Sequence, residues 1–190
     1  MKILKTLWVL IALTSLTLAA AEEKDKGKEA GSKTGDKEKA AADPEAVFRK
    51  PFTLKLYVDK EHFYEEKFGE IPYVHSGNVY LFKDDELGLR LEMKGEVISK
   101  VKYEPDLTKA DVTLKFSQKV SAEGTAMMLL HLHNNTKQTL NFDALMTTPG
   151  RKGIAKTSIL PLLPGLSGFE SWPHPIVQLV LQDIRIGKEK

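Results

Sequence analysis

The chain has 190 residues, of which 28 are basic and 26 acidic, and it contains no cysteine. The absence of cysteine excludes a disulfide framework, a thiolate metal site and a cysteine nucleophile. Lys2 and Lys5 lie in a segment that we interpret below as a cleaved export signal. Without these two lysines the chain has 26 basic and 26 acidic residues. A chain that is neutral in this way has no general attraction to nucleic acid.

Residues 1–21 have the pattern of a secretory signal peptide. Lys2 and Lys5 precede an apolar run over 7–18, and small residues stand just before Glu22. The run is too short to remain as a permanent span of ~30 Å of hydrocarbon, and the small residues permit cleavage. We therefore expect an exported protein, periplasmic or secreted, with no membrane span after cleavage. The absence of disulfides favours a bacterial envelope.

The next segment, 22–46, holds eight acids and six lysines among small residues, with no aromatic residue and no Val, Ile, Leu or Met. Such a segment cannot bury enough apolar surface to offset the entropy of ordering it. The sequence therefore predicts a disordered, charged tether.

The block 47–190 has the size of one domain, and its hydrophobic residues recur with a period of two. Period-two alternation is typical of half-buried strands. Turn residues such as Gly95 and Asn134–Asn135 separate most of the runs, and long helices are absent from the pattern. We expect an all-β fold, a single antiparallel β-sandwich. The predicted strands are 52–58, 78–82, 87–93, 96–103, 112–116, 126–133, 140–146, 157–160 and 176–186.

One segment, 60–68, departs from this pattern, because Phe63 and Phe68 flank a charged stretch. This spacing predicts one short surface helix packed on an end of the sandwich.

The strands 127–133 and 140–146 predict a hairpin around 134–138. An apolar strand that leads into Asn-Asn-Thr and then into Leu140-x-Phe142-x-Ala144 is similar to the central strands of immunoglobulin-like exported domains. The resemblance implies an immunoglobulin-like sandwich architecture and no particular activity.

His131 and His133 form a candidate metal site. Residues two apart on a strand project from the same face, so both imidazoles point the same way, and Met127 shares that face. Two imidazoles with a thioether suit copper, and the imidazoles alone suit zinc. The alternative is that both histidines are solvent-facing side chains at a strand end; no cofactor is required by the sequence.

A second candidate site is the Pro- and Gly-rich region 147–175, which contains Phe169, Trp172 and Arg151. Long irregular loops in compact domains are often functional, and an aromatic anchor on such a loop suits a partner protein. The alternative is that Trp172 plugs one end of the sandwich.

No residue spacing is diagnostic of catalysis. The sequence therefore predicts a non-enzymatic exported module that binds an envelope protein through loops or strand edges. Two alternatives remain: a copper or zinc protein, and an enzyme with a dispersed catalytic site around His75 or His174.

Overall fold

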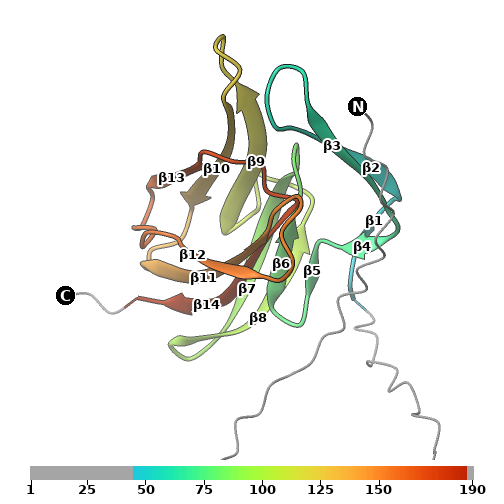
Figure 1. Ribbon diagram of the computed structural model, residues 1–190. Helices are drawn as coiled ribbons and strands as arrows, with labels where there is room; N and C mark the ends of the chain where they lie inside the picture. Colours follow the sequence, from blue (N-terminus) through green and yellow to red (C-terminus); the bar gives the residue numbers. More distant parts are fainter. Residues whose placement is uncertain (1–44, 188–190) are drawn as a thin grey trace, which may run out of the picture. The chain divides into compact units, whose positions relative to one another are not determined.

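The structure is a computed structural model that describes residues 45–187. The predicted signal peptide and nearly all of the predicted tether lie outside the described residues. Within 45–187 the chain forms fourteen β-strands and no helix (Figure 1). Among these residues there is accordingly no helix long and apolar enough to cross a membrane.

Two five-stranded antiparallel sheets pack together, so the predicted all-β sandwich is confirmed. Sheet 1 has the order β13-β10-β9-β7-β8, and sheet 2 has the order β12-β11-β14-β6-β5. The strands of sheet 1 are β7 (Glu86–Lys94), β8 (Val97–Glu104), β9 (Val112–Val120), β10 (Ala126–Asn134) and β13 (Ser167–Trp172). Those of sheet 2 are β5 (Val74–His75), β6 (Asn78–Leu81), β11 (Leu140–Thr147), β12 (Ala155–Ser158) and β14 (Gln178–Ile186).

The core lies between the sheets because each strand turns alternate side chains inward. In β10, Met128, Leu130 and Leu132 are at most 1% exposed, whereas the alternating residues Met127, Leu129 and His131 are more exposed and point outward. This alternation is the period-two pattern that the sequence shows, and it fixes which side chains are left for function on the outer face.

The predicted helix over 60–68 is wrong. This segment contains β3 (Phe63–Phe68), which pairs with β2 (Phe52–Tyr57) as a two-stranded hairpin beside the sandwich (Figure 1). The physical reason is a non-local partner: Phe68 stacks on Phe52 at 5.3 Å between ring centroids. Cross-strand aromatic packing of this kind outweighs a weak local preference for helix.

The chain enters the domain through a further pair of short strands, β1 (Phe48–Arg49) and β4 (Ile71–Pro72). Glu45, at the end of the predicted tether, forms ion pairs with Lys100 and Lys102 of β8 at 2.6 and 2.9 Å. Glu45, a residue of the predicted tether, therefore contacts β8.

The segment 159–166 links β12 to β13 and closes one edge of the sandwich. Ile159 and Leu162 are buried, and Leu162 forms two backbone hydrogen bonds with Leu140 of β11, of 2.8 and 2.9 Å. Gly168 of β13 leaves room for this cover, since a Cβ atom there would lie 3.1 Å from Leu162 Cδ1.

Candidate functional site

The outer face of sheet 1 is divided into two chemically different halves. On β7, β8 and β9, charged side chains pair across neighbouring strands: Lys115 with Glu86 at 2.9 Å, Arg90 with Glu104 at 3.2 Å, and Lys102 with Glu92 at 2.8 Å. Docking on this half would require removing water from paired charges, which is costly. It is therefore a solvated surface.

The other half, on β10 and β13, carries an aromatic pair that we call the aromatic platform, Phe169 and His131. The two residues lie directly opposite each other in the ladder, and their rings stack with centroids 4.5 Å apart and planes 9° apart. Phe169 is 74% exposed, so one ring face rests on His131 while much of its surface meets solvent. The stack fixes the orientation of a large exposed apolar side chain.

The surroundings of the aromatic platform are mostly uncharged. His133 Nδ1 lies 3.0 Å from Ser167 Oγ, and Leu129 and Met127 continue the outer face of β10. Lys115, opposite His131 on β9, is the neighbouring charge, and its ammonium is held by Glu86. The platform thus combines an apolar centre with hydrogen-bonding side chains around it.

Trp172, one of the predicted partner-binding residues, is 7% exposed and belongs to the core. Its ring packs edge-on against Phe116 at 6.3 Å, and its Nε1–H donates to Thr157 Oγ1 at 2.9 Å. The ring is packed and the Nε1–H is hydrogen-bonded inside the sandwich. Trp172 therefore closes the core and offers no surface to a partner.

Arg151, the third predicted partner-binding residue, is exposed. It follows β11, in the turn where its backbone N–H donates to Thr148 O. Trp172 pairs with Met128 of β10, so the Phe169 ring lies farther along β13, near the middle of the strand. Among residues 45–187, no hydrogen bond, ion pair or ring contact joins Arg151 to Phe169.

The three candidate metal ligands share a face but are widely spaced. At about 3.3 Å per residue along a strand, Met127 lies about 13 Å from His131 and about 20 Å from His133. In addition, His131 stacks on Phe169 and His133 contacts Ser167. Within the described part of the chain, no three His, Cys, Asp or Glu side chains gather where they could hold one ion. The arrangement gives no support to a copper or zinc site.

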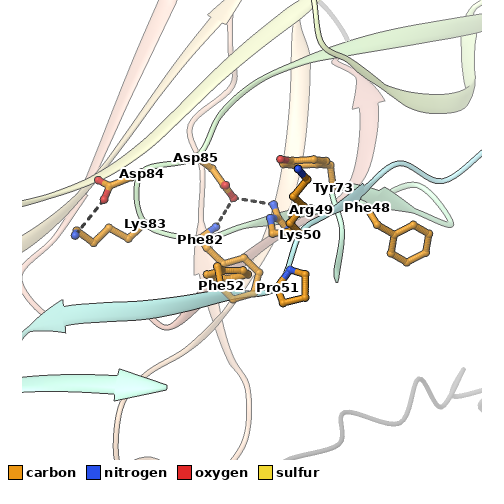
Figure 2. A pocket seen from close by; sticks show the side chains of 10 residues that line it. All are labelled: Phe48, Arg49, Lys50, Pro51, Phe52, Tyr73, Phe82, Lys83, Asp84 and Asp85. Carbon is orange, nitrogen blue, oxygen red and sulfur yellow. Dashed lines mark hydrogen bonds and ion pairs between the residues drawn. The ribbon is translucent and has the colours of Figure 1, made fainter. Parts of the chain in front are cut away.

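An open hollow of about 560 Å³ lies where β1 meets the turn between β6 and β7 (Figure 2). Four of its five charged side chains form two ion pairs, Arg49 with Asp85 at 2.8 Å and Lys83 with Asp84 at 3.1 Å, and the fifth is Lys50. Burial lowers the pKa of Arg49 and raises that of Asp85, in each case against the opposing effect of the partner's charge.

The guanidinium of Arg49 also lies between two rings, 4.3 Å from the centroid of Tyr73 and 5.0 Å from that of Phe82. Tyr73 stacks in turn on Tyr103 of β8, and Phe82 contacts Phe52 of β2 (the Phe82 and Phe52 rings are seen in Figure 2). These contacts tie β1 and the β2–β3 hairpin to the sandwich. We call Arg49, Asp85, Tyr73 and Phe82 the Arg49 clasp. The charges and rings of the clasp contact one another, so its role is structural.

A second, smaller hollow lies between two hairpin tips and is lined by Asp59, Lys60, Glu61, His62, Glu123 and Gly124. His62 Nδ1 contacts Asp59 at 2.9 Å, but both side chains are open to solvent. Neither of the two hollows contains His75 or His174, and His174 Nδ1 contacts the backbone oxygen of Pro175. The enzyme alternative therefore has no supporting geometry in either hollow.

Comparison with known proteins gives no match: no family model fits the chain, and no curated protein or solved structure is significantly similar to it.

The sequence predicts Phe169 as a partner-binding residue, but it does not predict the pairing of Phe169 with His131. The ladder that places Phe169 opposite His131 joins residues 38 positions apart, and only the sheet order β13-β10 reveals it. Sequence reasoning also missed Arg49, because a single arginine beside a phenylalanine carries no signal of burial.

Proposed function

We propose that this protein is an exported, immunoglobulin-like binding module of the cell envelope, without catalytic activity, which engages a protein partner through the aromatic platform. The observation that supports the proposal best is the exposure of Phe169, at 74%, on a ring stack that fixes its position. The signal-peptide pattern of residues 1–21 supports export.

The proposal follows from the energetics of protein interfaces. A few large side chains near the centre of an interface supply most of the binding free energy, and aromatic residues are enriched among them. A side chain that is already oriented loses less conformational entropy on binding. Phe169 meets both conditions, whereas Trp172 is used in the core.

The test is site-specific photo-crosslinking in cells that export the full chain. A photoreactive amino acid replaces Leu129, which lies on the outer face two residues from His131. We expect one crosslinked protein, and we expect the same product to be lost when Phe169 is also replaced by Ala. The captured protein is then purified and its affinity measured directly.

Met93 provides the matched control, since it is an exposed apolar side chain of β7 on the far part of the same sheet. The exchange Met93→Ala should leave the crosslink intact. A crosslink that persists in Phe169→Ala, or one lost equally in Met93→Ala, would contradict the proposed contact surface.

A further inference from the structure

The loop between β12 and β13 exposes three leucines, and we call it the leucine loop: Leu160, Leu163 and Leu166. They are 72%, 50% and 53% exposed, although neighbouring Ile159 and Leu162 are buried. No residue from 157 to 169 is charged. Three large apolar side chains presented by one uncharged loop form a surface that calls for an apolar contact.

The loop is held in place from within the domain. Asn134 is fully buried, and its Nδ2 donates to Leu162 O at 3.1 Å and to Leu163 O at 3.2 Å. The backbone N–H of Asn134 donates to Leu166 O at 3.0 Å. Hydrogen bonds thus hold the backbone of the loop at Leu163 and at Leu166, so the exposure of these two side chains is a feature of the fold.

Basic side chains accompany the leucine loop. Lys137 lies in the turn whose Gln138 O accepts from the same Asn134 Nδ2, and Lys156 of β12 precedes Leu160 by four residues. Among the described residues, neither lysine takes part in an ion pair, whereas the nearby carboxylate of Glu170 accepts the Leu160 N–H at 2.8 Å. Arg151 and Lys152 add two further exposed cations to the preceding loop.

The composition of this surface favours lipid over protein. Leucine is under-represented among the side chains that dominate protein interfaces. Leucine and phenylalanine combined with lysines are typical of amphipathic helices in the membrane interface, and the leucine loop has the same combination of residue types. Uncompensated cations near the apolar side chains match the negative surface potential of anionic lipids.

We propose that the leucine loop docks the domain on the surface of an anionic lipid membrane. The leucines enter the boundary between headgroups and acyl chains, and Lys137 and Lys156 contact anionic headgroups. Three leucines bury little surface, so the attachment is weak and reversible. The loop leads directly into β13, which carries Phe169 of the aromatic platform. This proposal rests on the leucines and lysines alone, so it does not depend on the proposed protein partner.

The test is co-sedimentation of the full exported chain with vesicles of phosphatidylcholine alone or mixed with phosphatidylglycerol. We expect at least about tenfold more binding to the anionic vesicles, and less as salt is raised. The double exchange Leu163→Ser with Leu166→Ser should abolish the difference. All variants have the same sequence before residue 45, so any change in binding comes from the loop.

The control exchanges Met93→Ser and Val97→Ser remove exposed apolar side chains at another edge of the domain and should bind as the parent chain does. A separate exchange, Leu163→Trp, should give fluorescence that shifts to the blue on anionic vesicles. Equal binding to both vesicles, full binding by the leucine variant, or no shift would overturn the proposal. If the variant with Leu163→Ser and Leu166→Ser lost the protein crosslink but bound vesicles normally, the leucine loop would belong to the contact with the protein partner instead.

Discussion

Arg49 Nη2 lies 2.8 Å from Asp85 Oδ2, and the two side chains are only 6% and 16% exposed. Asp85 Oδ2 also accepts the backbone N–H of Phe82 at 2.7 Å, and Arg49 Nη2 donates to Tyr80 O at 2.8 Å. One ion pair therefore joins the entry strand β1 to the end of β6 and to the turn that leads into β7. The Arg49 clasp links the first described residues to the core.

Removal of one partner of this pair should be strongly destabilising. Arg49→Ala leaves the Asp85 carboxylate buried without its counter-charge, and we expect a loss of about 3–5 kcal/mol in the free energy of unfolding. Urea denaturation measures the loss. Arg49→Met combined with Asp85→Asn should lose less than the two single exchanges summed. Strict additivity would contradict a direct pair.

Glu45 should titrate far below an ordinary glutamate. Hydrogen bonds from the ammonium groups of Lys100 and Lys102 lower its pKa from 4.5 to about 2. Because the folded-state pKa is depressed, its contribution to stability is present above pH 4.5 and is lost as the pH falls from there toward 2. The carboxyl resonance of Glu45 in an NMR titration measures the midpoint. Lys100→Gln with Lys102→Gln should return it toward 4.5; a midpoint already at that value in the parent chain would contradict the contact.

Gly88 should not tolerate a side chain. A Cβ atom there would lie 2.6 Å from Ala110 Cβ and 2.7 Å from the backbone oxygen of Glu104. We expect Gly88→Ala to lower the free energy of unfolding by about 1–3 kcal/mol, as overpacking does. Gly69 has no atom within 4 Å of the corresponding position, so Gly69→Ala is the control. Equal melting temperatures for the two variants would show that β7 and β8 can separate at no cost.

The predictability of this fold differs between local and non-local features. The runs Leu87–Leu89 and Met128–Leu132 revealed strands because one buried face imposes a period of two. The segment 63–68 misled the prediction, since its character as a strand depends on pairing with β2 and on the Phe52–Phe68 stack. The spacing of residues within a segment does not show which strand the segment pairs with.

In the candidate site, too, the sequence predicts local features and not non-local ones. Phe169 stands out in the sequence as an aromatic residue of a long loop region, but Trp172 stands out equally, and only burial separates them. The pairing of His131 with Phe169 can be found only when the order of the strands in sheet 1 is known. The candidate metal ligands Met127, His131 and His133 lie on one face of β10. The period-two pattern predicts this shared face, but it does not show whether their side chains converge on one point.

We propose that Phe169, held by His131, is the main contact with a protein partner. The most direct test of this claim is the dissociation constant of the purified chain for the crosslinked partner, measured for the parent, Phe169→Ala and Met93→Ala. We predict at least about tenfold weaker binding for Phe169→Ala, equivalent to about 1.4 kcal/mol, and no change for Met93→Ala. Unchanged affinity in Phe169→Ala would contradict the claim.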